Sequence, residues 1–396
     1  MKKLIVLSVV FALVAAAAFA VDLSASVFGL VTPFQSDTAK NADDEASKIT
    51  SSGEFKRIRF DGAGEAGDGA FGGWIRFDGG FSGYSFWKPI DQFKMLIGGN
   101  PDGMYGKEGV TGWMFHENPY DAGVAIGGGN VWGYGAGWPW DGDDPENGPG
   151  KGGDKYNEYG AWKHPYNIKT RDVFYGGFGG NALHLNIKPI DILGINLVLP
   201  FFGGGETEAV FGNITAQLDL NLDFGNIAVT YDAWKAGDNS GGKVYAYFGG
   251  SFGDLGLDVG VSLGFNNLEG DENKDPIGFG VGVKFATDAF GIKFRTVATL
   301  AGGDKATRIL AELVPYFPLG DNMAAFVGVG ICMLQPDEGD SLMGWHFNPY
   351  IRVGEEWGAQ FLAGVKVWSG GKATVDAKGN DGIIYWSVPI AIMLSF

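Results

Sequence analysis

The chain has few of the features that usually stabilise a secreted protein or anchor one in a membrane. It contains a single cysteine, Cys332, so no disulfide can form within the chain, and we interpret this residue as a small packed apolar side chain. After Val21 no apolar stretch approaches the ~20 residues that a membrane-spanning helix needs. Basic residues are also scarce, since 29 lysines and arginines stand against 46 acids and give a formal net charge of −17. This balance argues against nucleic acid or an anionic membrane surface as the main partner.

Patterns of catalysis and of metal binding are weak as well. The stretch GGSFG at 249–253 matches G-x-S-x-G, but that motif needs a turn from a strand into a helix, and strand patterns lie on both sides here. The four histidines, His116, His164, His184 and His346, do not have the spacing of metal ligands. We therefore expect neither enzymatic activity nor a cofactor.

The N-terminus carries an export signal. Lys2 and Lys3 precede an apolar core, and Ala18-Phe19-Ala20 forms an A-x-A cleavage site. This arrangement is typical of a secretory signal peptide and is too short for a membrane anchor. We expect residues 1–20 to be removed and residues 21–396 to form one domain.

The strongest pattern in the rest of the chain is a period of two. The segment LGLDVGVSLGF at 255–265 places its leucines, valines and phenylalanine on one face, and its glycines, aspartate and serine on the other. Strict alternation over this length predicts a strand with one apolar and one polar face. Similar runs recur toward the C-terminus, and the last one, IYWSVPIAIMLSF, ends at Phe396.

The length of these runs favours a membrane over water. Strands of soluble sandwiches usually run ~5–6 residues, whereas a tilted strand needs ~9–11 residues to cross a bilayer. A closed barrel is then the only solution, because every backbone polar group must be paired within lipid. The polar faces are rich in glycine, of which the chain has 68, and this suits an inner wall. A soluble secreted β-protein is the alternative.

The connections between the runs are of two kinds. Short turns such as Lys88-Pro89-Ile90-Asp91, repeated at 188–191, alternate with long polar loops such as NNLEGDENKDP. Proline cannot donate a ladder hydrogen bond, and aspartate can close a turn, so we expect both KPID stretches to be tight turns. Short turns on one side and long loops on the other are typical of outer-membrane barrels. The sequence predicts an all-β, antiparallel, up-and-down transmembrane barrel of about 16–18 strands, with eighteen as the preferred count.

Alternation also assigns the charges of three neighbouring runs to the interior. In KRIRFD at 56–61, Ile58 and Phe60 face lipid, so the arginines between them face inward. A charge on the lipid face at mid-membrane would cost ~2–4 kcal/mol, which favours this assignment. The basic cluster could select solutes through its field, or it could simply pair with neighbouring acids. The candidate pore-lining residues are Arg57, Arg59, Arg76, Lys94, Asp61, Asp78 and His184.

Residues 100–171 interrupt the pattern. This segment is rich in glycine, tryptophan and aspartate and shows no lasting period. We expect it to be a long extracellular loop or a loop folded into the pore, where its aromatics could stack on sugar rings, and a plain solvated loop is the alternative. The candidate ligand residues of this loop are Trp132, Trp138, Trp140, Asp141 and Asp143.

The signal peptide, the alternating runs and the final SVPIAIMLSF together resemble bacterial outer-membrane β-barrels. The run FWKPIDQFKMLIGGNPDG, from Phe86, more narrowly resembles spirochaete-type barrels of this group. The resemblance implies location in the outer membrane of a diderm bacterium, assembly by the barrel assembly machinery through Phe396, and a porin-like channel for small hydrophilic solutes. The alternative function is a surface adhesin or receptor acting through residues 100–171. A homo-oligomer is a further possible assembly.

Overall fold

The computed structural model describes residues 21–36, 49–77, 80–98, 182–200, 214–236, 239–267, 277–300, 307–335, 341–354, 359–369 and 384–395. These residues form one sheet of nineteen antiparallel strand segments, so the all-β prediction is confirmed. Within the same ranges there is no helix long and apolar enough to cross a membrane.

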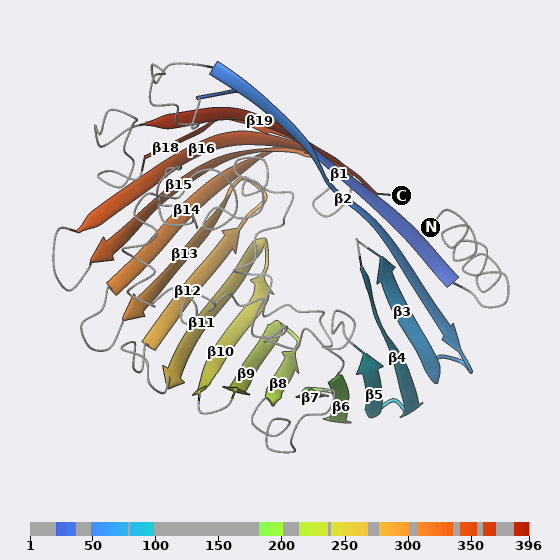
Figure 1. Ribbon diagram of the computed structural model, residues 1–396. Coiled ribbons are helices and arrows are strands. Elements are labelled where there is room, and N and C mark those ends of the chain that lie inside the picture. The colour runs from blue at the N-terminus through green and yellow to red at the C-terminus, as the bar shows by residue number, and fades with distance from the viewer. Residues whose placement is uncertain are drawn as a thin grey trace.

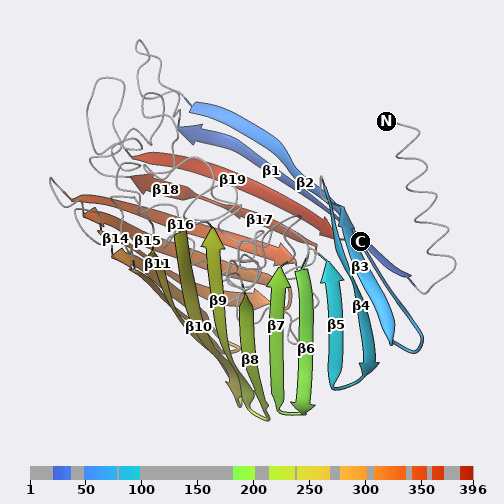
Figure 2. The ribbon, with the colours of Figure 1, turned by 60° about the horizontal axis from the view of Figure 1, so that its bottom comes forward.

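The sheet closes on itself. Each strand pairs with its neighbours in chain order, and β1 (Val21–Ser36) pairs both with β2 (Ile49–Ala66) and with β19 (Tyr385–Ser395). Figure 1 shows the strands following one another around a ring, and Figure 2 shows how strongly they are inclined. The strands between β2 and β19 are β3 (Phe71–Phe77), β4 (Phe81–Ile90), β5 (Phe93–Gly98), β6 (Ala182–Ile190), β7 (Leu193–Pro200), β8 (Thr215–Leu222), β9 (Gly225–Ala236), β10 (Asn239–Phe252), β11 (Leu255–Asn267), β12 (Ile277–Ala286), β13 (Gly291–Leu300), β14 (Thr307–Gly320), β15 (Met323–Gln335), β16 (Leu342–Gly354), β17 (Gln360–Gly364) and β18 (Lys366–Ser369).

Two of these segments occupy one position in the ring. Both β17 and β18 pair with β16 on one side and with β19 on the other, and only Val365 separates them. The register is the same before and after the break, because Tyr350 pairs with Gly364 and Phe347 with Val367. The described strands therefore occupy eighteen positions, which is the preferred count from the sequence.

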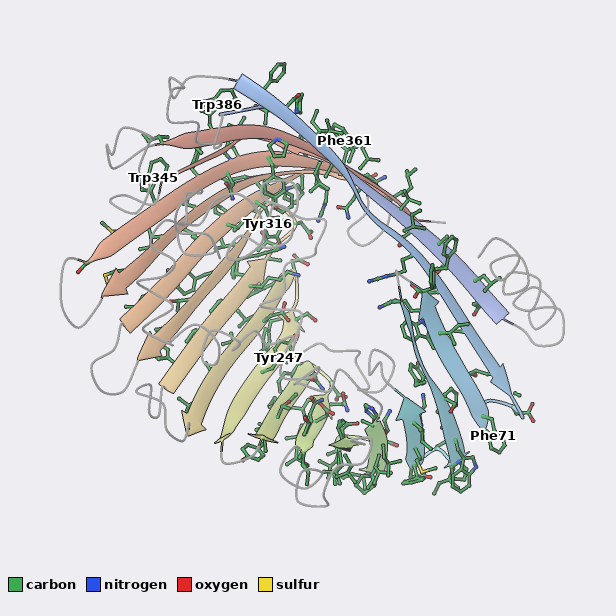
Figure 3. All side chains as sticks on the ribbon, viewed as in Figure 1. Phe71, Tyr247, Tyr316, Trp345, Phe361 and Trp386 are labelled. Atoms are coloured by element: carbon green, nitrogen blue, oxygen red, sulfur yellow. The ribbon has the colours of Figure 1, made fainter. Side chains whose placement is uncertain are left out.

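The distribution of polar and apolar side chains is the reverse of that in a soluble protein. Large apolar side chains such as Ile75 and Leu263 are 50–60% exposed, whereas Thr215, Thr230 and Asn196 are at most 1% exposed. The two kinds alternate along each strand, so the apolar side chains point away from the ring and the polar ones toward its interior. Figure 3 shows Phe71 on the outside and Tyr247 and Tyr316 on the inside. This arrangement suits a wall between lipid and water.

Both KPID repeats lie at tight hairpins, as expected, but the turn begins later than the sequence suggested. Lys88, Pro89 and Ile90 still belong to β4, and the two-residue turn consists of Asp91 and Gln92. Pro89 falls where the β4–β5 register shifts, so its missing N–H does not remove a hydrogen bond from the regular ladder. The Lys88 ammonium binds the Asp91 carboxylate at 2.7 Å and closes the turn. The second repeat has the same form, with its turn at 191–192.

Aromatic side chains gather on the outer face near the tight turns. Phe224, Phe248 and Phe252 lie with ring centroids 6.1–6.5 Å apart, and Phe285 lies 5.5 Å from Phe290. Aromatic girdles of this kind mark the level of the lipid headgroups in membrane barrels. The tight turns therefore define one rim of the barrel.

Candidate functional site

The N-terminal part of the inner wall holds an ion pair between adjacent strands. The Arg76 guanidinium on β3 donates through Nε to Asp61 Oδ1 on β2 at 2.7 Å, with a second contact from Nη2 to Oδ2 at 3.4 Å. The two residues are directly opposite in the register, so alternation brings them together without any loop. Both side chains remain partly exposed to the interior. A two-point contact fixes the guanidinium in one orientation.

Lys94 lies two strands further along the same wall. Its ammonium is 4.0 Å from the centre of the Phe86 ring on β4, a cation–π contact that holds the charge against the wall. Arg59, on β2, is half-buried and alternates with the strongly exposed Ile58 and Phe60, so it too points inward. Arg59, Arg76 and Lys94 thus have the inward orientation that alternation predicts; their role in conduction stays a prediction.

Several candidate residues lie outside the described part of the chain. The backbone of Arg57 pairs with Phe28, but the position of its side chain is outside the description. The same holds for the whole of Asp78 and Phe396, and for residues 1–20 and 100–171. The candidate ligand residues of the loop, which also lie outside the described residues, are Trp132, Trp138, Trp140, Asp141 and Asp143.

His184 points inward, but it lies in an apolar part of the wall. It is 4% exposed and pairs with Leu96 across β5 and β6 and with Val198 across β6 and β7. Leu96 and Val198 form a small buried cluster, against which Phe86 packs. The inner wall is thus not polar throughout, because the even positions of β5 and β7 include large aliphatic residues.

A chain of hydrogen bonds on β6 to β9 was not foreseen from the sequence. The Asn186 amide donates to Asn196, and the Asn196 amide donates to Asp219 Oδ2 at 2.6 Å. On the other side of this carboxylate, the Gln217 amide donates to Oδ1 at 2.7 Å, and Thr230 donates to Gln217 Oε1 at 3.0 Å. The chain joins four strands and satisfies an acid that alternation places inside. The runs LHLNI, GINLVL and AQLDLNLD contain the two asparagines, Gln217 and Asp219, but only the register aligns them with each other and with Thr230.

A stack of aromatic rings crosses the opposite part of the wall. Phe326 on β15 lies between Tyr350 on β16, at 4.5 Å and 9°, and Tyr316 on β14, at 5.4 Å and 22°. Two cations flank it: the Arg352 guanidinium is 5.2 Å from the Phe326 ring centre, and the Lys293 ammonium is 5.9 Å from both Phe326 and Tyr316. The sequence predicts that these side chains face inward, but it does not show which of them lie beside each other on neighbouring strands.

The described ranges contain no group of three or more histidine, cysteine or acidic residues that could hold a metal ion. The described part of the inner wall offers charged side chains, an ion pair, a polar chain and an aromatic stack, which are groups able to interact with a solute through charge and hydrogen bonds.

No protein-family model matches the sequence, and no curated protein is detectably similar to it. Solved structures do match. OccK10 (OpdN) of Pseudomonas aeruginosa is 8% identical, with a TM-score of 0.50 over 95% of this chain and 99% of that one. The fold is that of an outer-membrane β-barrel. An anion-selective porin from Comamonas acidovorans matches at 10% identity and a TM-score of 0.44, with 95% and 99% of the two chains covered. The trimer form of in-vitro folded OmpT from Vibrio cholerae matches at 10% and 0.43, with the same coverage. At these identities the likeness extends to the fold alone.

Proposed function

We propose that the protein is an outer-membrane channel through which small hydrophilic solutes diffuse passively. The observation that carries the proposal is the inside-out wall: a closed ring of eighteen strand positions with apolar side chains outward and polar or charged ones inward. A ring of this size encloses an aqueous lumen unless a loop or plug fills it. The likeness to outer-membrane channels supports the fold on which this reasoning depends.

The proposal assigns selectivity to the charges on β2, β3 and β5. Arg76 and Asp61 neutralise each other while paired at 2.7 Å, so the net field of this wall depends on the balance of its other charges, among them Arg59, Lys94 and Glu65. A net positive wall weakens the cation preference that the acidic chain would otherwise impose. Removal of one partner of the pair should expose the charge of the other.

The test is conductance of the purified full chain in planar bilayers under a salt gradient. Stepwise currents are expected. Arg76→Gln should shift the reversal potential toward cations, Asp61→Asn should shift it toward anions, and the double variant should lie close to the unmodified protein. Absence of current at every voltage would contradict the channel, whereas conduction with unchanged selectivity in all three variants would contradict only the role of this pair.

The finer parts of the proposal concern export and assembly. Cleavage of residues 1–20, recognition of the last strand through Phe396 by the barrel assembly machinery, a homo-oligomeric state and the spirochaete-type likeness all remain proposals. The alternative function, an adhesin or receptor, depends wholly on residues 100–171. Deletion of that segment separates the two, because a channel keeps or increases its conductance and an adhesin loses binding.

A further inference from the structure

Prolines of several strands lie close to one line across the wall. Pro315 lies in β14 and Pro349 in β16, with Val327 of β15 between them. Val327 pairs with Pro349 directly. It lies opposite Pro315 because the pairs on either side, at 313 and 329 and at 316 and 326, keep one register. Pro315, Val327 and Pro349 therefore lie side by side across three strands.

The row continues through the break between β17 and β18. The Val365 N–H donates to the Pro349 carbonyl at 2.9 Å, and proline cannot donate in return. On the other side, Gly364 lies opposite Pro389 of β19, because the residues at 363 and 366 pair with those at 390 and 387. Pro33 of β1 follows, within a shift of register opposite Pro389. We call Pro315, Pro349, Pro389 and Pro33 the proline row.

The backbone pairing is interrupted at three places along the row, although the β13–β14 and β15–β16 ladders continue through it. Between β14 and β15 the ladder omits the two positions that follow Leu313. β17 and β18 are separated at Val365, and the β1–β19 register shifts between Val31 and Phe34. Proline is otherwise confined to edge strands and bulges, since it removes a ladder hydrogen bond. Here the gaps in β14–β15, at Val365 and in β1–β19 all lie on or beside one line across the strands.

Pro315 lies deep in the membrane. Pro315 is six residues before the tight turn that starts at Asp321. At ~3.3 Å per residue and a tilt of 35–45°, this places it about 15 Å from the rim, near the middle of an apolar band about 25 Å tall. The lipid on the outer face supplies no donor or acceptor to replace a missing backbone bond. A gap in the ladder at this depth therefore weakens the wall locally.

The aromatic stack braces the row from the inside. Tyr316 follows Pro315, Phe326 precedes Val327 and Tyr350 follows Pro349, so their rings lie on the inner face beside the row. They stack across β14, β15 and β16, where the β14–β15 ladder is incomplete. Beside the row, the fully buried Asn348 carboxamide has no hydrogen-bond partner for either Nδ2 or Oδ1 within the described residues. The stacked rings therefore stabilise a part of the wall where backbone hydrogen bonds are missing.

We propose that the proline row is a hinge line in the barrel wall, along which the two halves of strands β14 to β1 bend relative to each other, and that the stack of Tyr316, Phe326 and Tyr350 holds the hinge closed. Bending of the wall along this line requires less free energy than bending elsewhere. The hinge is a property of the folded barrel, and it does not depend on whether the lumen conducts.

Amide hydrogen exchange of the full chain in lipid nanodiscs tests the hinge. The Val365 amide should exchange at least about tenfold faster than the Val261 amide, which lies at a similar depth in a wall without prolines. Tyr350→Leu removes the brace and should speed exchange at Val327 and Val365 while leaving Val261 unchanged. Pro349→Val should restore a donor and slow exchange at Val365.

Two results would overturn the hinge. One is exchange at Val365 as slow as at Val261 in the unmodified protein. The other is a Tyr350→Leu variant whose exchange rises equally at Val261 and Val365, because the stack would then stabilise the whole barrel and not this line. If Pro349→Val does not fold, the comparison of the unmodified chain with Tyr350→Leu still decides the matter.

Discussion

Val261→Arg tests directly whether the apolar face of β11 contacts lipid, through its effect on the free energy of unfolding. Val261 is 46% exposed on the outer face of β11, opposite Ala246 on β10 and Val281 on β12. It is six residues beyond Leu255, where β11 leaves the tight-turn rim, so it lies near the middle of the apolar band. An arginine there must extend into hydrocarbon or distort the bilayer to reach water.

The magnitude follows from this depth. Arginine on the lipid face at the bilayer midplane costs ~2–4 kcal/mol, and the cost falls to ~0–1 kcal/mol near the interfaces. At 1.4 kcal/mol for each tenfold change, the folding equilibrium should weaken by roughly 30- to 700-fold. In a soluble protein, an arginine at a valine that is nearly half exposed would change stability by no more than about 0.5 kcal/mol.

Reversible unfolding by urea in lipid vesicles measures the difference. The matched control is Ser262→Arg, one residue further along, which the alternation of a strand assigns to the opposite face. The Val261 variant should lose stability and the Ser262 variant should lose much less. Equal losses, or a larger loss at Ser262, would refute the assignment of faces.

Two smaller predictions follow from contacts near the turns. Gly291→Ala should destabilise the barrel by about 1–3 kcal/mol, because a Cβ there would collide with the Tyr316 ring, whereas Gly256→Ala, whose Cβ would meet its nearest neighbour only at 3.8 Å, should cost little in the same unfolding assay. Lys88 lowers the pKa of Asp91 below its ordinary value through a hydrogen bond and its charge, so the stabilisation from this pair is present at neutral pH and is lost as the pH falls through the lowered pKa. Lys88→Met should raise that pKa toward 3.8, and a titration of the Asp91 carboxyl by NMR that shows no change would contradict the pairing.

The faces of the strands could be predicted from the sequence because alternation is a local property. Ile58, Arg59 and Phe60 fall on the sides that period two assigns, and so does Lys94. The tight turns were predictable for the same reason, since proline, glycine and aspartate act within a few residues. The one local error was the start of the KPID turns, where the strand tolerates Pro89 at a register shift.

Features that depend on the register between strands were not predictable. The proximity of Asn196 to Asp219, and the stacking of Tyr316 on Phe326, require knowledge of which residues lie opposite each other. Alternation leaves that open, because a strand can slide by two residues and keep its faces. The break at Val365 was not predictable for the same reason, since only the register shows that Pro349 lies opposite Val365.

The single native cysteine makes a direct test of the inside-out wall possible. In a Cys332→Ala background, single cysteines from 257 to 263 can carry spin labels in lipid vesicles, and their collision rates with oxygen and with a water-soluble nickel complex can be measured. The account predicts that odd positions collide mainly with oxygen, as in lipid, and even positions mainly with nickel, as in water. Odd positions shielded from both reagents, as in a core between two sheets, would contradict it.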